Sequence, residues 1–311
     1  MKTVYPRLCL TILAIFSLTA CGGGGGGGTS GGVGVTVTPN FTSWSAVLPG
    51  STVAASGDSQ QGTYSINLGT DKVTATTVGV QQSGATFTER FSATHPYLAE
   101  TVRFQTASGT DISFTRGADM FFSLIIDNDF WGIESADGTK HALMADPVEN
   151  GWEYQSFGIW TTGAGTGSGT HGAASVGSPT PIGSIPTSGI FNYIGVAGGR
   201  HVASDGSYYF TLATMDTSVN FATRQLGFTT SITLETPNLF TSTPNNSLNM
   251  TGTLSYVSGS NQFSGVVSTA SGMTGTAKGR FYGPVAQEIG GTFSVTGAGV
   301  QAYGGAFGGA R

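Results

Sequence analysis

The sequence predicts an all-β fold, with an N-terminal β-rich handle domain followed by a C-terminal eight-stranded antiparallel β-barrel. Aromatic residues make up 11% of the chain and recur in alternating patterns, while no segment shows a convincing 3.6-residue period. Glycine occurs 50 times in 311 residues, and only 9% of the residues are charged. Such a chain has too little charge for charge-driven disorder and enough glycine for many tight turns.

The first 20 residues have the pattern of an export signal. Lys2 and Arg7 precede the apolar run Leu8–Phe16, which is too short to span a bilayer as a helix. Leu18-Thr19-Ala20-Cys21 follows, and a small residue directly before a cysteine is typical of a bacterial lipoprotein cleavage site. We therefore expect residues 1–20 to be a signal peptide and Cys21 to carry a lipid. The alternative is an ordinary secretory signal with an incidental cysteine.

Residues 21–40 are expected to form the lipidated end and a Gly-rich tether. The glycines Gly22–Gly28 follow Cys21 directly, and this composition gives a flexible spacer. Cys9 is lost with the signal, so Cys21 has no partner for an intramolecular disulfide and the fold must rely on its core. We expect the lipid to hold the protein at the bacterial outer membrane, exposed at the cell surface.

The charge balance disfavours two classes of partner. The 12 basic side chains fall to 10 when Lys2 and Arg7 are removed, against 17 acidic ones, which gives a net charge of −7. An acidic chain lacks the basic stripe that nucleic acid requires. It also cannot adhere to an anionic membrane by charge, so the lipid must provide the anchor.

Residues 41–177 are assigned to the handle domain and its Gly/Ser/Thr-rich linker. Strand-like runs occur at Gly62–Ile66, Val73–Val80, Thr101–Phe104, Asp111–Phe114 and Met120–Ile126. Ser108-Gly109 and Asp137-Gly138 are hairpin-type turn signals between such runs. The segment Thr161–Thr170 has no hydrophobic period and is predicted to be a long exposed loop or an interdomain linker. Pro179, Pro181 and Pro186 follow it, so we place the domain boundary near residue 178.

Residues 178–311 show a cleaner period of two. Leu226, Phe228, Ile232 and Leu234 share one parity, which predicts one buried and one wet face. Further strands are predicted at Gly189–Ala197, Tyr208–Met215, Met250–Tyr256, Gln262–Val267, Met273–Phe281, Ile289–Val295 and Ala302–Phe307. Eight or nine short antiparallel strands favour a closed barrel, which leaves no exposed edge.

A transmembrane barrel would alternate in the same way, with its apolar face outward. Three features favour a soluble barrel instead. The lipid already anchors the chain, no aromatic girdles repeat at the strand ends, and the chain ends in Gly308-Gly309-Ala310-Arg311 rather than in an apolar aromatic strand.

A Gly- and Pro-containing segment near the C-terminus is expected to be structural rather than a reaction centre. Phe281 should end a strand, and Gly283-Pro284 should turn the chain into one short helical turn, Val285–Glu288. Gly290-Gly291 allow the next strand to begin where neighbouring backbone approaches closely. Phe293 then has the parity of a core residue.

This segment resembles a signature of a known family, the G-x-F-Y-G-P-x-A-x-E-x-G-G-x-F pattern in the barrel domain of transferrin-binding protein B. The positions that we assign to the motif are Gly279, Phe281, Tyr282, Gly283, Pro284, Glu288, Gly290, Gly291 and Phe293. The factor H-binding lipoprotein and haemoglobin-binding surface lipoproteins share that barrel, and the tail Tyr303–Ala310 looks like a member's last strand. The resemblance implies a family barrel over about 187–311, preceded by a variable handle.

No arrangement of residues supports an enzyme or a metal site. None of His95, His141, His171 and His201 is spaced as a zinc pair, and no G-x-S-x-G motif occurs. Asp127-Asn128-Asp129 resembles part of a calcium loop but lacks the downstream glycine and glutamate. His171 and His201 could each ligate haem iron, but we expect both to be solvated loop residues, so no cofactor is assigned.

These features predict a monomeric binding module at the cell surface. The resemblance implies capture of a protein, haem or iron-carrier ligand for an outer-membrane receptor of the TonB-dependent type. We expect ligand contacts in the loops Thr161–Ser178, Arg200–Ser207 and Thr236–Asn249. The last contains Leu239 and Phe240, which either anchor an interface or fold back onto the handle.

Two alternatives to this binding function stay open. One is a structural, adhesive or host-factor-binding envelope lipoprotein without a role in nutrient uptake. The other, which is the least favoured, is a hydrolase on a β scaffold. The chain also has fewer Lys and Arg than pathogen members of the family often display, which leaves the identity of any host ligand open.

Overall fold

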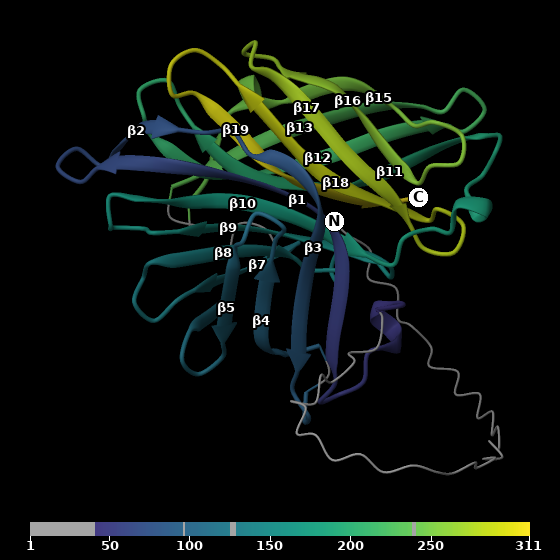
Figure 1. The fold of residues 1–311 in the computed structure, drawn as a ribbon, viewed down its shortest axis with the longest axis horizontal. Helices are drawn as coiled ribbons and strands as arrows, with labels where there is room; N and C mark the ends of the chain where they lie inside the picture. Colours follow the sequence, from purple (N-terminus) through teal and green to yellow (C-terminus); the bar gives the residue numbers. More distant parts are fainter. Residues whose placement is uncertain (1–40, 96, 125–128, 238–240) are drawn as a thin grey trace, which may run out of the picture. The chain divides into compact units, whose positions relative to one another are not determined.

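The computed structural model describes residues 41–311 apart from 96, 125–128 and 238–240, and its secondary structure is almost entirely antiparallel β-sheet (Figure 1). The expected all-β fold is therefore confirmed. Cys21, Leu239 and Phe240 lie outside the described residues. The helical elements in the described part are the short 3-10 turns η1 (Trp44–Ala46), η2 (Ile182–Ser184) and η3 (Asn246–Leu248). In that part of the chain no helix is long and apolar enough to cross a membrane.

The first sheet, which we call the handle sheet, contains ten strands. They are β1 (Thr52–Asn67), β2 (Lys72–Thr76), β3 (Val80–Phe91), β4 (Ala99–Gln105), β5 (Asp111–Thr115), β6 (Met120–Ser123), β7 (Phe130–Glu134), β8 (Lys140–Ala145), β9 (Gln155–Thr162) and β10 (Ser168–Gly177). Their order is β5-β4-β3-β1-β10-β9-β8-β7-β6, with β2 paired to one end of β1. The sheet does not close, so β5 and β6 are its two edges.

The segment Thr161–Thr170 is part of a β-hairpin, so its assignment as an exposed loop or linker is wrong. Thr161 pairs with His171 across β9 and β10, and β10 also pairs with β1 near the centre of the sheet. Gly163 and Gly167 have φ values of +72° and +88° in the turn, a conformation that glycine adopts without strain. On β10, a Cβ added to Gly172 would lie 2.4 Å from the Trp160 ring. Close packing against Trp160 therefore requires glycine at this position. Because a glycine stands where an alternating pattern would place a larger side chain, the segment shows no hydrophobic period in the sequence.

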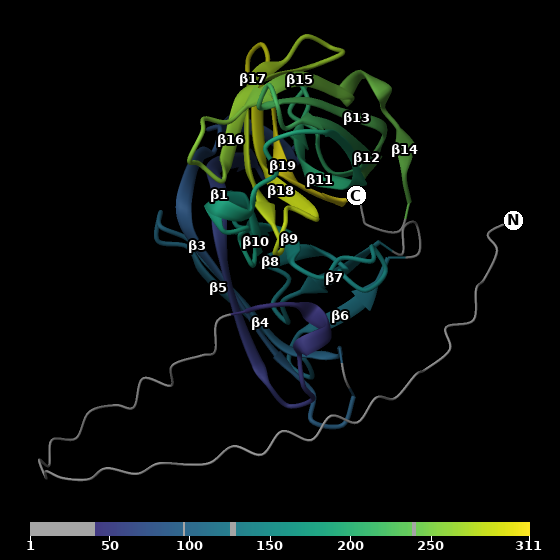
Figure 2. The same cartoon turned by 90° about the vertical axis from the view of Figure 1, so that its right-hand side faces the viewer.

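The second sheet closes into a barrel. Its strands are β11 (Ile190–Val202), β12 (Tyr208–Asn220), β13 (Gln225–Thr236), β14 (Thr243–Pro244), β15 (Met250–Ser255), β16 (Gln262–Thr269), β17 (Thr274–Tyr282), β18 (Glu288–Thr296) and β19 (Ala302–Ala310). Leaving out the two-residue β14, eight strands form a ring in which β12 pairs with both β11 and β13 (Figure 2). The predicted eight-stranded antiparallel barrel is confirmed, and apolar side chains fill its interior.

The predicted parity of β13 fails from Ile232 onward. Leu226 and Phe228 are fully buried, but Ile232 is 63% exposed and has a φ of +53°. Leu234 is only half-buried, and Thr233 between them is fully buried. Leu212 of β12 pairs with Leu234, whereas Thr214 pairs with Ser231, so β13 contains one extra residue at this point. The extra residue forms a β-bulge, which turns Ile232 outward.

The motif segment joins β17 to β18 by a turn rather than by a helical turn. Residues 283–286 form the turn, and Glu288 is already the first residue of β18, so the predicted helical turn Val285–Glu288 is wrong. Ala286 has a φ of +59°, which is incompatible with a right-handed helix. Phe281 and Phe293 are fully buried in the barrel core, and the burial of Phe293 is the one that its parity predicts.

The same segment connects the barrel to the handle sheet. The Glu288 carboxylate accepts hydrogen bonds from the backbone N–H groups of Glu153 (2.6 Å) and Tyr154 (2.9 Å), just before β9. Burial raises the pKa of Glu288 to about 7, although these backbone donors act in the opposite direction. Arg280 of β17 donates two hydrogen bonds of 2.7 Å to Asp58 of β1. The motif therefore has a structural role at the contact between the two sheets.

The two sheets also share one hydrophobic cluster. Its members from the handle sheet include Phe157 and Ile159 on β9, and those from the barrel include Leu212 and Ala306. Gly177 ends the handle sheet and Ile190 begins the barrel, and the chain between them runs along the motif turn. Within it, the Thr180 N–H donates to the Phe281 carbonyl over 2.9 Å.

Candidate functional site

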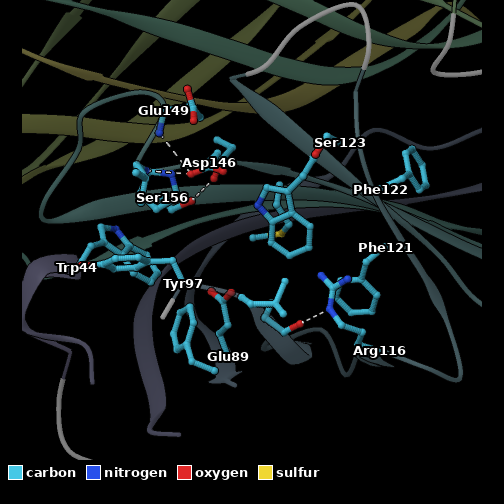
Figure 3. A pocket seen from close by; sticks show the side chains of 18 residues that line it. Trp44, Glu89, Tyr97, Arg116, Phe121, Phe122, Ser123, Asp146, Glu149 and Ser156 are labelled. Carbon is cyan, nitrogen blue, oxygen red and sulfur yellow. Dashed lines mark hydrogen bonds between the residues drawn. The ribbon is translucent and has the colours of Figure 1, made fainter. Parts of the chain in front are cut away.

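A cavity of about 350 Å³ opens on the handle sheet (Figure 3). Its walls come from β3, β4, β6, β7, β8 and β9, from the segment Asp146–Glu149 after β8, and from η1. A cavity of this size lies within the range of small-ligand sites, or it can receive one side chain of a protein partner. We take this cavity, the handle cavity, as the candidate site.

Aromatic side chains form much of the cavity wall. The rings of Phe121 and Trp131 are stacked, with centroids 5.8 Å apart and an interplanar angle of 17°. Trp44 lies opposite and contacts Phe91 edge to face, with centroids 6.5 Å apart. Trp131 and Phe121 are only partly buried, and both rings line the cavity. Such rings present negatively polarised faces, which attract cations.

Glu89 of β3 is the unusual polar residue of the cavity. Its side chain is 6% exposed, and its carboxylate has no hydrogen bond or ion pair with any described residue. Burial raises the pKa of Glu89 to about 8, and the negative charge of Asp146 acts in the same direction. A buried carboxyl group without a partner is unfavourable for folding, which makes Glu89 a candidate binding residue.

The remaining charged groups of the cavity are held by local contacts. The Asp146 Oδ1 atom accepts hydrogen bonds from the N–H groups of Val148 (2.9 Å) and Glu149 (3.4 Å). Arg116 donates through Nε to the Ala99 carbonyl over 2.7 Å, and its guanidinium lies 4.5 Å from the Phe121 ring centroid. Three carboxyl groups, those of Glu89, Asp146 and Glu149, therefore face the cavity with one guanidinium.

This arrangement can bind a cation. An ammonium or guanidinium group in the handle cavity would pair with the Glu89 carboxylate and contact the ring of Trp131. Binding would return Glu89 to its ionised form, because a nearby positive charge lowers the pKa of a carboxyl group. Among the described residues, no group of three or more His, Cys, Asp or Glu could hold a metal ion.

Sequence reasoning missed Glu89, although the sequence contains a signal for it. Ala85, Phe87, Glu89 and Phe91 share one parity of β3, and all four are buried. A single acidic residue in an otherwise apolar row of a strand is the pattern of a buried carboxylate. Recognising it required β3 to be predicted as a strand.

The structure places the predicted haem candidates in packed positions rather than in solvated loops. His171 lies on β10 and is 4% exposed, and burial together with the charge of Arg200 lowers its pKa to about 4. His201 lies on β11, where its Nδ1 atom is 2.6 Å from the Glu235 carboxylate. Neither histidine lines the handle cavity. Of the predicted calcium-like segment, Asp127 and Asn128 lie outside the described residues.

The three predicted ligand loops are shorter than expected. Thr161–Ser178 is the hairpin described above, and Arg200–Val202 belong to β11. Of Thr236–Asn249, the structure describes a two-residue strand and the turn η3, in which Leu248 is buried. The handle cavity contains residues of none of these loops.

The fold defines a class of protein with a closed eight-stranded barrel and an attached open sheet. Residues 185–311 match the family described as the C-lobe and N-lobe beta barrels of Tf-binding protein B. The barrel of this chain is therefore similar to the barrels of that family, and the resemblance seen in the motif is confirmed.

Solved structures of similar proteins include three with broad coverage. The haemoglobin receptor HpuA from Kingella denitrificans is 19% identical, with 89% of this chain and 91% of that chain covered and a TM-score of 0.40. A double mutant of transferrin-binding protein B from Haemophilus parasuis Hp5 is 12% identical, with coverages of 85% and 78% and a TM-score of 0.43. Transferrin-binding protein B from serogroup B Neisseria meningitidis is 16% identical, with 74% of this chain and 52% of that chain covered and a TM-score of 0.40. A comparison with curated proteins gives no match.

Proposed function

We propose that the chain is a lipid-anchored lipoprotein of the bacterial outer membrane that binds a host iron-carrier protein at the cell surface. The observation that carries this proposal is the match of residues 185–311 to the barrels of Tf-binding protein B. The N-terminal signal, Cys21 and the following glycines support an anchored and tethered protein. An outer-membrane receptor of the TonB-dependent type would then receive the iron or haem.

In this proposal, the handle cavity receives a basic side chain of the carrier. A lysine or arginine at the tip of a partner loop fits a cavity of about 350 Å³ that contains Glu89 and stacked aromatic rings. Residues that fill well-packed, desolvated pockets contribute most to binding between proteins. One inserted basic side chain could therefore supply much of the affinity.

The test is binding of the purified chain to iron-loaded transferrin and to haemoglobin, measured by surface plasmon resonance. We expect at least one of the two to bind, and Glu89→Gln to weaken binding by about tenfold or more, because a charge-assisted pair is lost. Glu100→Gln is the matched control, since Glu100 is on the neighbouring strand β4 but does not line the cavity. If neither carrier binds the wild-type chain, the assignment to iron-carrier binding fails.

The anchor has a separate test. Cys21→Ala should prevent incorporation of labelled palmitate and release the protein from the membrane fraction, because Cys21 is the only cysteine left after cleavage. Cys9→Ala is the control and should keep the label. Incorporation of labelled palmitate into the Cys21→Ala variant would show that the lipid is not attached at Cys21.

A further inference from the structure

A second cavity, of about 300 Å³, lies where residues of the handle sheet and of the barrel meet. The handle sheet contributes Tyr64 and Ile66 from β1 and His141 from β8. The barrel contributes Arg200 from β11 and Tyr208 and Phe210 from β12. We call this the junction cavity. It shares no residue with the handle cavity.

Arg200 is the buried charge of the junction cavity. Arg200 is only 9% exposed. No carboxylate of the described residues lies within ion-pairing distance of its guanidinium. Its guanidinium carbon lies 4.3 Å from the Tyr208 ring centroid and 5.1 Å from that of Phe210. Burial lowers the pKa of Arg200, but an arginine stays protonated at any physiological pH.

A comparison within the molecule shows what Arg200 lacks. Arg280 also lies where the two sheets meet, and it forms a bidentate pair with the buried carboxylate of Asp58. The Arg200 guanidinium has aromatic rings as neighbours but makes no hydrogen bond to any described residue, and rings cannot accept its in-plane N–H donors. A buried cation that lacks an anion is destabilising. A bound anion would remove that deficit.

The other ionisable groups around the cavity leave the Arg200 charge available. Glu134 lies 3.8 Å from His141 and is not among the groups whose charges act on the Arg200 pKa. Asp71 accepts a hydrogen bond of 3.2 Å from the Tyr208 hydroxyl, so its charge reaches Arg200 only at longer range. His171 and His141 both have lowered pKa values, mainly because of burial, and are neutral at pH 7.

The apolar part of the wall indicates what the anion is attached to. Tyr64, Tyr209, Phe210 and Pro237 line the cavity beside Arg200. A flat apolar group can pack against these rings, while a planar carboxylate fits the fork of a guanidinium with two parallel hydrogen bonds. We propose that the junction cavity is a binding site for a carboxylate carried on an aromatic group, with Arg200 as the residue that binds the carboxylate. The source of that group is either a free aromatic acid or the C-terminal aromatic residue of a peptide.

The test compares benzoate with benzamide, which has the same shape but no charge, on the purified full chain by isothermal titration calorimetry. We expect benzoate to bind at least about tenfold more tightly. A tripeptide that ends in phenylalanine, with a free or an amidated C-terminus, distinguishes the two sources. If only benzoate binds, the ligand is a small acid, and if the free-acid peptide binds more tightly than benzoate, a chain terminus is favoured.

Three variants assign the effect to Arg200. Arg200→Met should abolish the preference for benzoate over benzamide, and Arg200→Lys should reduce it, because an ammonium group cannot form the fork. Arg90→Met removes an exposed arginine of β3 and should leave the preference unchanged. Cooperative thermal unfolding of each variant checks that it is folded. If Arg200→Met does not fold, the benzoate preference of Arg200→Lys is the test of the role of Arg200. Equal affinity of the wild type for benzoate and benzamide, no benzoate binding at millimolar concentration, or a preference that survives loss of Arg200 would overturn the proposal.

Discussion

The barrel and the handle sheet use their aromatic side chains for different purposes. In the barrel, Phe228 and Phe307 pack with centroids 4.8 Å apart, and Phe293 and Tyr303 do the same, all of them fully buried. On the handle sheet, Phe121 and Trp131 pack against each other as well, but one side of the pair faces the handle cavity. A closed sheet leaves its interior rings no free surface, whereas an open sheet can offer rings to a ligand.

The buried ionisable groups follow a related division. Asp58 with Arg280 and His201 with Glu235 form close pairs, at 2.7 and 2.6 Å. Glu89 and Arg200 have no such side-chain partner in the described part of the chain, and each lines a cavity. The paired groups therefore have a structural explanation, and the two unpaired ones are the candidates for binding a ligand.

The largest expected effect tests the barrel side of this comparison. Phe293→Ala should lower the free energy of unfolding by roughly 3–5 kcal/mol, because a fully buried ring is replaced by a cavity in a closed core. Chemical denaturation monitored by circular dichroism measures it. Val266→Ala, on the exposed outer face of β16, is the control and should change little. A loss below about 1 kcal/mol for Phe293→Ala would mean that the barrel core can rearrange.

The second prediction concerns Glu89 and pH. The pKa of Glu89 is raised from 4.5 to about 8 in the folded protein, so between these values the folded state binds more protons than the unfolded state. Its contribution to stability is therefore fully present below pH 4.5 and is lost as the pH rises through 8. Glu89→Gln stays neutral and should be more stable than the wild type at pH 9, by on the order of 5 kcal/mol.

The measurement is the free energy of unfolding of both proteins from pH 5 to pH 9. Glu288, whose pKa is also raised, is present in both, so the difference between the two curves isolates Glu89. Parallel curves would show that the Glu89 carboxyl group is solvated or paired. In that case it could not be the cation site of the handle cavity.

Sequence reasoning predicted the barrel far better than the handle sheet. The predicted strand Tyr208–Met215 lies within β12, and Met273–Phe281 matches β17 to within one residue at each end. Both strands are covered on one face by the barrel core and exposed on the other, which produces a period of two. Ile232 was misplaced because a β-bulge shifts parity without any residue type that marks it.

The handle sheet lacks that signal for a physical reason. β10 contains Gly172 and Ala173 at its centre and is buried on both faces, so small residues replace the alternation. The pairing of β1 with β10 joins residues such as Gly57 and Val176, which lie far apart in the sequence, and local patterns contain no information about such pairs. The handle cavity is formed by six strands of this sheet, so its residues could not be grouped before the strand order was known.

The smallest expected effect on stability comes from the wall of the handle cavity. Trp131 is only partly buried, so Trp131→Ala should cost about 1–2 kcal/mol of unfolding free energy, less than Phe293→Ala in the closed core. The same change should reduce carrier binding by about tenfold or more, because an accessible aromatic face is lost from the proposed site. Trp131→Phe keeps a ring and should retain most of the binding. If Trp131→Ala lowered stability as much as Phe293→Ala and left binding unchanged, the ring would have to be regarded as core. Trp131 in the open sheet would then not differ in role from Phe293 in the closed core.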